Sequence, residues 1–128
     1  FKGFVSEFLE SYLEKNKISK KETKTNISRV VAIGPAPMMA AVSNVTKPYD
    51  IKTIVSLNTI MVDATGMCGV CRIEVKGETK FVCVDGPEFD GHEVNFGLLF
   101  ARQNMYCEEE KKAYDIYNKK CGCKGNKG

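Results

Sequence analysis

This 128-residue sequence has few of the features that mark nucleic-acid-binding, membrane or secreted proteins. Its formal net charge is only +3, and the lysines between Lys15 and Lys24 cluster in a polar connector, where solvated lysines are common. No apolar run approaches the roughly 20 residues that a membrane span needs, and no secretory signal is seen. We therefore expect no nucleic-acid partner and no membrane association.

Histidine is nearly absent, which limits the metal sites that the chain can build. The single His92 lies in a turn-rich stretch, where we expect an exposed imidazole without function. The sequence also lacks the G-x-G-x-x-G signature of a phosphate-binding loop. The chain begins with Phe1 rather than methionine, and from this we expect a fragment of a longer protein.

The cysteines are the most informative residues. Six cysteines without a secretory signal favour thiolate ligands in a reducing compartment over a disulfide scaffold, so we expect a cytoplasmic protein. Asp63, Cys68, Cys71 and Cys83 form an acid-x4-Cys-x2-Cys-x11-Cys array. Thiolates select iron-sulfur clusters or zinc, and a Cys-x2-Cys pair aims two sulfurs at one centre. The spacing is typical of a loop around an iron-sulfur cluster.

The residues around the array support this interpretation but leave alternatives open. Gly66 and Gly69 flank the first cysteine and allow backbone N–H groups to approach inorganic sulfide closely. Zinc remains an alternative, although structural zinc sites usually pair two Cys-x2-Cys knuckles and this chain has one. A redox dithiol fits less well, because Cys71 runs directly into strand-like residues. The assignment of Asp63 as a ligand depends on spacing alone, because an Asp in a glycine-containing turn is usually a turn former.

The first sixty residues predict half of a doubly wound α/β sheet. The predicted elements are an amphipathic helix over residues 4–15, a strand over 27–34, a helix over 35–45 and a strand over 49–57. The first strand is apolar and β-branched, as in a strand buried on both faces, and Pro35 and Pro37 are tolerated in the first turn of the helix. Strand, helix and strand within about 30 residues form a βαβ unit with parallel strands.

The strand ends of this unit predict where a cofactor binds. Ligands of such sheets bind beyond the carboxyl ends of the strands, which places Gly34 and Pro35 on the same rim as Asn58. The chain then reaches Asp63 within a few residues, so a redox centre there would lie near a bound cofactor. A simple strand-to-helix turn explains Gly34 and Pro35 equally well.

The rest of the chain predicts a hairpin, a long helix and a tail. Residues 72–75 and 79–83 alternate around a turn and would return Cys83 to the cysteine pair. The predicted divisions are 1–60, half of a nucleotide-binding domain; 61–95, a cluster module; 96–118, one helix; and 119–128, a disordered tail. The expected buried face of the helix is Phe96, Leu99, Phe100 and Met105. We assign no role to Cys107, Cys121 and Cys123.

The motifs together carry a family resemblance. The segments AIGPAPMM, SLNTIMVDATGMCGVCRIEV and ETKFVCVDGPEFDGHEVNF resemble the carboxyl-terminal part of the small flavin subunit of NADH-dependent ferredoxin:NADP+ oxidoreductase, also called sulfide dehydrogenase. The resemblance runs from Phe4 to about Tyr117. Electron-transfer subunits of dihydroorotate dehydrogenase are wider relatives, in which a fourth cysteine stands where this chain has Asp63.

The resemblance implies a ferredoxin reductase-like protein with an FAD-binding barrel, a Rossmann-like NAD(P)-binding domain and a 2Fe-2S module. The barrel and the first half of the nucleotide domain would precede Phe1. The implied cluster ligands are Asp63, Cys68, Cys71 and Cys83, and the implied nicotinamide-side residues are Gly34, Pro35 and Met38, with Asn58 on the same rim. Ile33 stands where a cysteine often faces the nicotinamide in ferredoxin reductases.

The resemblance also implies a function. In the whole protein, NAD(P)H would reduce FAD, and single electrons would pass through the 2Fe-2S cluster toward a larger flavin and iron-sulfur subunit, with ferredoxin or a similar carrier reached indirectly. The fragment alone would hold the relay and be inactive. The alternatives are a zinc-stapled, non-catalytic interaction module and a dihydroorotate dehydrogenase electron-transfer subunit.

Overall fold

The computed structural model describes residues 2–15 and 27–121, so most of the lysine-rich connector and the last seven residues lie outside the described part. The helices are α1 (Val5–Lys15), α2 (Ala36–Thr46), the 3-10 helix η1 (Lys47–Tyr49), α3 (Val82–Asp85), α4 (Phe96–Gln103) and α5 (Cys107–Cys121). The strands are β1 (Val30–Ile33), β2 (Thr53–Ser56), β3 (Arg72–Val75), β4 (Glu78–Phe81) and β5 (Glu88–Asp90). The predicted α/β class is confirmed.

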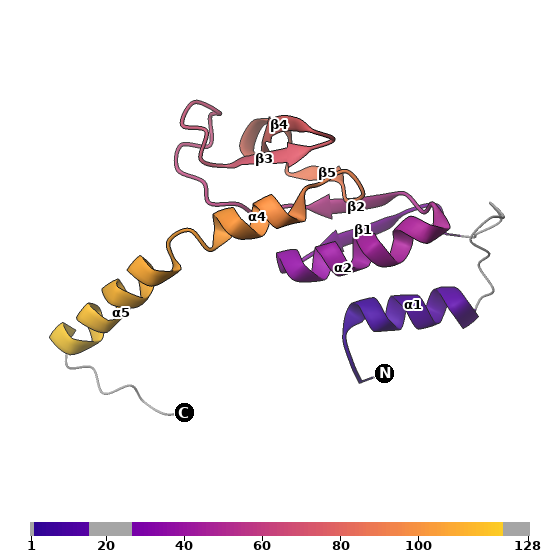
Figure 1. Cartoon of the computed structure of the whole chain (residues 1–128), viewed down its shortest axis with the longest axis horizontal. Helices are drawn as coiled ribbons and strands as arrows, with labels where there is room; N and C mark the ends of the chain where they lie inside the picture. Colours follow the sequence, from indigo (N-terminus) through magenta and orange to yellow (C-terminus); the bar gives the residue numbers. More distant parts are fainter. Residues whose placement is uncertain (1, 16–26, 122–128) are drawn as a thin grey trace.

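The βαβ unit forms as the sequence predicts. Strands β1 and β2 pair in parallel, with Ile33 opposite Ser56, and α2 connects them. Helix α2 lies along this sheet and α1 packs against α2 (Figure 1). The prediction that β1 is buried on both faces is wrong: Ala32 is buried, but Val31 and Ile33 are 55% and 70% exposed. Among the described residues β1 is an edge strand, and its covered face is the one that carries Ala32.

A third strand lies in the stretch that the sequence marks only as turns. Strand β5 pairs antiparallel with β2 and places Asp90 opposite Ile54. It has only three residues, and the turn-forming residues Gly86, Pro87 and Gly91 bound it, so the sequence pattern indicates turns rather than a strand. The predicted hairpin of β3 and β4 is present as a separate antiparallel pair. Cys83 lies in α3, directly after the hairpin, rather than in the second strand itself.

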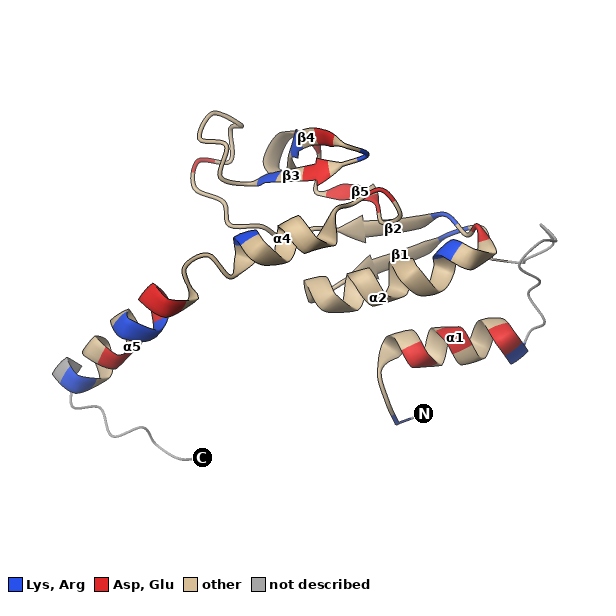
Figure 2. Cartoon of the chain, viewed as in Figure 1, with Lys and Arg blue, Asp and Glu red and all other residues tan. Residues whose placement is uncertain are grey.

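The carboxyl-terminal segment is two helices rather than the single one expected. Helix α4 ends at Gln103, and α5 begins at Cys107, four residues later. Leu99 is 1% exposed and anchors α4 in the core, whereas Met105, expected on the buried face, is 48% exposed because it lies in the break. Helix α5 extends away from the sheet, and acidic and basic side chains alternate along it (Figures 1 and 2). It includes residues 119–121 of the expected tail.

One apolar core joins the sheet to the hairpin. Met39 of α2, Val55 of β2 and Leu99 of α4 are buried in the same cluster as Cys71 and Ile73, which begin the hairpin. The sheet therefore fixes the position of the second cysteine of the array.

His92 is not the exposed residue that the sequence predicts. Its side chain is 18% exposed, and its Nε2 lies 3.0 Å from the Thr46 hydroxyl oxygen at the end of α2. Thr46 is fully buried, as is Thr53 of β2, whose hydroxyl donates to the Thr46 oxygen over 2.6 Å. These three side chains connect α2, β2 and the turn after β5 through buried polar groups, which must stay paired.

We expect Thr53→Val to lower the free energy of unfolding by about 1–3 kcal/mol, because it removes a donor inside this buried network. Urea unfolding followed by circular dichroism measures the change. Thr79→Val is the matched control, since Thr79 is an exposed threonine of β4, and we expect its effect to stay within about 0.5 kcal/mol. Equal effects of the two substitutions would contradict a stabilising role for the network.

Candidate metal centre

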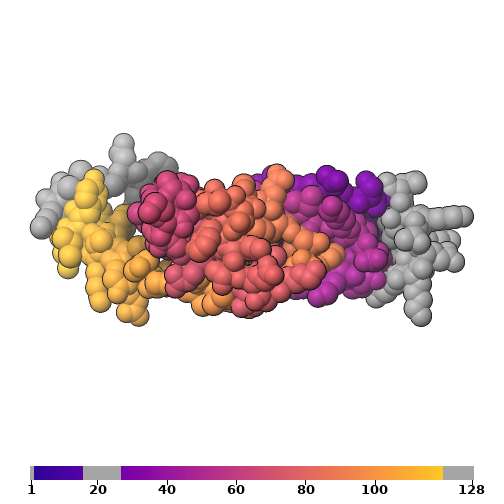
Figure 3. Space-filling model, turned by 90° about the horizontal axis from the view of Figure 1, so that it is seen from above, coloured from indigo at the N-terminus to yellow at the C-terminus, as the bar shows by residue number. Residues whose placement is uncertain are grey.

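The array lies in one irregular loop and the short helix that faces it. The loop, residues 58–71, joins β2 to β3 and contains no helix or strand; we call it the cluster loop. It carries almost no charge apart from Asp63 (Figure 2). Met67 is 89% exposed and Val62 74% exposed, so the loop presents apolar side chains to solvent. Figure 3 shows this part of the sequence at the surface.

Cys71 and Cys83 are brought together. Their sulfur atoms lie 3.2 Å apart, with Cys71 buried in the core and Cys83 half-buried in α3. Both are free thiols. Two sulfurs on one tetrahedral metal, with metal–sulfur bonds of about 2.3 Å, lie about 3.8 Å apart. The pair is therefore close to the spacing that a shared metal ion requires.

The surroundings of the two thiols shift their pKa values in opposite directions. Burial raises the pKa of the Cys71 thiol, but the backbone and the thiol of Cys83, together with other backbone groups, outweigh it, and the net effect is a pKa below the usual value. The pKa of Cys83 is raised, chiefly because it shares a hydrogen bond with Cys71, although the Gly66 N–H acts in the opposite direction. N–H donors of this kind stabilise thiolate ligands.

Asp63 and Cys68 form the second half of the array at the surface. One Asp63 carboxylate oxygen accepts the Cys68 N–H over 2.9 Å, and the other accepts the Thr65 N–H over 3.0 Å. The Thr65 N–H is the main reason why the pKa of Asp63 lies below its usual value. The carboxylate is thus ionised at neutral pH, and it closes the turn that carries Cys68, which is exposed.

The structure brings the four predicted ligands together only in pairs. Within residues 2–15 and 27–121, no three side chains of the ligand types are gathered closely enough to hold a metal ion. The donor set, three thiols and a carboxylate in one loop and the short helix beside it, nevertheless fits an iron-sulfur cluster. His92, the only histidine, is bonded to Thr46 instead.

The two loop glycines have the conformation that the sequence predicts. Gly66 and Gly69 have φ values of +84° and +66°, which side chains rarely adopt. A Cβ on Gly66 would also lie 2.7 Å from the Val84 side chain. The loop can therefore pass close to α3 only with glycine at this position.

The predicted cofactor rim is also assembled. Because β1 and β2 are parallel, Gly34 and Asn58 follow strand ends at the same edge of the sheet. Met38 packs over Gly34, so that a Cβ there would lie 2.5 Å from the Met38 methyl carbon, and Pro35 directly precedes α2. The Asn58 carbonyl accepts a hydrogen bond from the Gln103 side chain over 2.8 Å.

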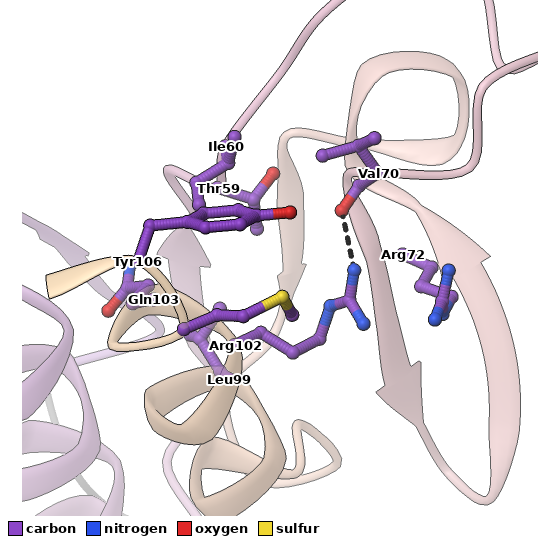
Figure 4. A pocket seen from close by; sticks show the side chains of 9 residues that line it. Thr59, Ile60, Val70, Arg72, Leu99, Arg102, Gln103 and Tyr106 are labelled. Carbon is purple, nitrogen blue, oxygen red and sulfur yellow. Dashed lines mark hydrogen bonds between the residues drawn. The ribbon is translucent and has the colours of Figure 1, made fainter. Parts of the chain in front are cut away.

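Sequence reasoning missed the residues of α4 that hold the cluster loop. Gln103 bonds Asn58 at the start of the loop, and the Arg102 guanidinium donates to the Val70 carbonyl near its end over 2.9 Å. Arg102 borders a cavity of about 190 Å³ between the loop and the break that precedes α5 (Figure 4). The available signal was two neighbouring polar residues at the end of an otherwise apolar helix.

Three thiols and a carboxylate on an α/β scaffold are a donor set of the kind that binds an iron-sulfur cluster, and comparisons with known proteins agree with this interpretation. Residues 58–95, which include all four candidate ligands, match the family described as the iron-sulfur cluster binding domain of dihydroorotate dehydrogenase B. The match agrees with the prediction that this segment resembles an iron-sulfur domain of oxidoreductase electron-transfer subunits.

Two curated proteins are similar to this chain in sequence. The chain is 47% identical over 134 residues to an uncharacterized protein in the adh 3′ region of Clostridium beijerinckii, covering 99% of the chain and 43% of that protein. It is 47% identical over 91 residues to a dihydroorotate dehydrogenase B electron transfer subunit homolog of Thermotoga maritima, covering 71% of the chain and 32% of that protein.

A solved structure of an NADH-dependent reduced ferredoxin-NADP oxidoreductase, described in connection with flavin-based electron bifurcation, superimposes with a TM-score of 0.72. It is 38% identical, and the match covers 88% of this chain and 38% of that one. The resemblance indicated by the motifs is thereby confirmed, and the chain spans less than half the length of these relatives. No helix in the described ranges has the length and apolar character of a membrane span.

We expect Gly66→Ala to reduce the amount of cluster that the protein retains, because the added Cβ collides with Val84 and moves the loop away from Cys83. The visible absorbance per protein after anaerobic purification measures the loss. Gly77→Ala is the control: Gly77 has a similar φ of +77° in the hairpin turn, but a Cβ there meets nothing within 4 Å. If Gly77→Ala loses as much cluster, general backbone strain explains the effect.

Proposed function

We propose that the chain is the cluster-carrying part of an oxidoreductase subunit that moves electrons between NAD(P)H, FAD and a 2Fe-2S cluster toward a partner subunit. The observation that carries the proposal is the pairing of the buried Cys71 with Cys83 inside a segment that matches an iron-sulfur binding domain. When bound, such a cluster supplies one-electron transfer.

The four ligands would divide between the two irons as the structure divides them. Cys71 and Cys83, already in contact, would share one iron, and Asp63 and Cys68, joined through the Cys68 N–H, would share the other. The first iron would lie against the core and the second at the surface. A carboxylate is a harder and more easily protonated ligand than a thiolate, which distinguishes the second iron chemically.

The nicotinamide of a bound nucleotide would lie at the edge of the sheet where β1 and β2 end. Gly34, Pro35 and Met38 lie where α2 begins, and Asn58 begins the cluster loop. The cluster loop and the proposed nicotinamide side therefore start from one edge of the sheet. A nicotinamide bound at this edge would lie on the side of the sheet from which the cluster loop leaves.

The exposed apolar side chains around the cluster loop support the proposal that a partner subunit binds there. Val62, Met67 and Val84 are 60–89% exposed around the array, and apolar side chains grouped at a redox site suit contact with another protein domain. The partner would be a larger flavin and iron-sulfur subunit, with ferredoxin or a similar carrier reached through it. A reducing compartment, for which we propose the cytoplasm, would keep the cysteines available as ligands.

The first experiment is an absorption spectrum from 300 to 700 nm of anaerobically purified protein, with iron, sulfide and zinc measured on the same sample. We expect visible bands that bleach with dithionite and equal amounts of iron and sulfide. Zinc without visible colour would instead establish the stapled interaction module. If a metal-free chain remains colourless after anaerobic reconstitution with iron and sulfide, the proposal is wrong.

Substitution of Asp63 tests the ligand set. We expect Asp63→Cys to retain the cluster and change its visible and electron paramagnetic resonance spectra, because a thiolate replaces a carboxylate at one iron. The control is Cys107→Ala, which removes a cysteine in α5 whose sulfur lies 3.7 Å from an Asn104 side-chain oxygen, and it should leave both spectra unchanged. Spectra of Asp63→Cys that match the parent protein would exclude Asp63 as a ligand.

A further inference from the structure

The cavity between the cluster loop and the break before α5 has a positively charged lining. Its volume is about 190 Å³, and among the described residues that line it none is acidic, whereas Arg72 and Arg102 are both basic (Figure 4). Within the described part of the chain, neither arginine forms an ion pair with a carboxylate. The cavity therefore offers positive charge that no described side chain neutralises.

Arg102 is the better placed of the two arginines to bind a ligand in the cavity. It is half-buried and extends from the last turn of α4 to the cluster loop, where Nη2 donates to the Val70 carbonyl over 2.9 Å (Figure 4). A guanidinium carries five N–H groups in a planar fork, so donors remain for a second acceptor. A carboxylate is the acceptor whose geometry matches that fork.

An unpaired hydroxyl independently indicates a polar ligand in the same cavity. Thr59 lines the cavity, and its hydroxyl oxygen is buried without a hydrogen-bond partner. Within residues 2–15 and 27–121, it is the single buried side-chain nitrogen or oxygen atom in this condition. Leaving a buried hydroxyl unpaired is unfavourable. Because a hydroxyl can donate one hydrogen bond, a carboxylate in the cavity would satisfy it.

The rest of the lining is mainly apolar and limits the shape of the ligand. Leu99 is buried, whereas Ile60, Met105 and Tyr106 also line the cavity and are exposed. Apolar walls with a few convergent polar groups are typical of small-molecule sites. An apolar cavity of about 150 Å³ can hold a benzene molecule, so this cavity has room for a ring of that size with a small substituent.

We propose that the cavity binds a small organic carboxylate with a flat apolar body. The carboxylate accepts hydrogen bonds from the Arg102 guanidinium and the Thr59 hydroxyl. The body lies against the Leu99 side chain and the Tyr106 ring. This site goes beyond the proposed function and needs no bound cluster, because none of the four candidate cluster ligands lines the cavity. Its occupant would nevertheless touch the cluster loop near both of its ends, at Thr59 and Val70.

Benzoate is the probe, and its binding to the parent chain is measured by ligand-observed NMR titration. Benzamide has the same shape without the charge, and acetate has the charge without the ring. We expect saturable benzoate binding with a dissociation constant of about 1 mM, and binding at least about tenfold weaker for benzamide, acetate and inorganic phosphate. The proposal is wrong if benzoate does not saturate, or if any of the other three binds as tightly.

Thr59→Val separates recognition of the ligand from packing. Valine keeps the shape and removes the hydroxyl, so without ligand we expect a melting temperature equal to or above that of the parent chain. Benzoate binding should weaken by about tenfold, as expected for the loss of a hydrogen bond to a charged group. Thr79→Val, on the exposed surface of β4, should change neither quantity. An unchanged benzoate affinity in Thr59→Val would overturn the proposal.

The two arginines provide a matched comparison. We expect Arg102→Met to weaken benzoate binding by at least about tenfold, because a charged hydrogen bond is lost. Arg72 is exposed and donates to the Gly69 carbonyl over 3.2 Å, so its charge is screened by salt, and Arg72→Met should weaken binding less than about threefold. Equal effects would indicate a general charge effect and overturn the site. If Arg102→Met does not fold, the comparison of benzoate with benzamide on the parent chain still decides whether the charge is recognised.

Discussion

The structure around the array depends on the burial of Cys71. This residue ends an exposed, irregular loop and at the same time belongs to the apolar core shared by the sheet, α2, α4 and the hairpin. Interior packing is dense enough that a buried side chain is held in one place. The loop can therefore be irregular elsewhere, because its last residue is fixed against Cys83 by the same contacts that stabilise the fold.

From this anchor the remaining parts of the site are held by backbone groups. Asp63 closes its turn by accepting two N–H groups, and the carbonyls of Asn58 and Val70 accept from neighbouring side chains of α4. The cluster loop thus needs little core of its own. Helix α4, whose Leu99 is buried in the apolar core, also supplies the two side chains that bind the ends of the loop.

Local and periodic features were predictable from the sequence. The βαβ unit was predicted from two apolar, β-branched runs with a helical segment between them. The positive φ angles of the loop glycines were predicted because a cluster site needs close approach of backbone N–H groups. The array of Asp63 and three cysteines was found from spacing alone, and its assignment as ligands stays a prediction. These features depend on neighbouring residues in the chain.

Features that depend on distant partners were not predictable. Strand β5 has three residues between turn formers, and it is a strand only because β2 offers it an edge. His92 was expected to be exposed, but it is half-buried because Thr46, 46 residues earlier, lies within hydrogen-bond distance. Arg102 and Gln103 belong to no sequence motif, and their contacts with the cluster loop depend on where α4 packs. The break between α4 and α5 likewise separates residues that pack on the core from residues that face solvent.

The array is asymmetric in its access to water, since Cys71 is buried and Cys68 is exposed. Solvent and oxygen can approach the pair formed by Asp63 and Cys68 directly, whereas the other pair is shielded by packed side chains. A cluster held by these four residues would therefore be open to solvent on the side of Asp63 and Cys68 and covered by the apolar core on the side of Cys71.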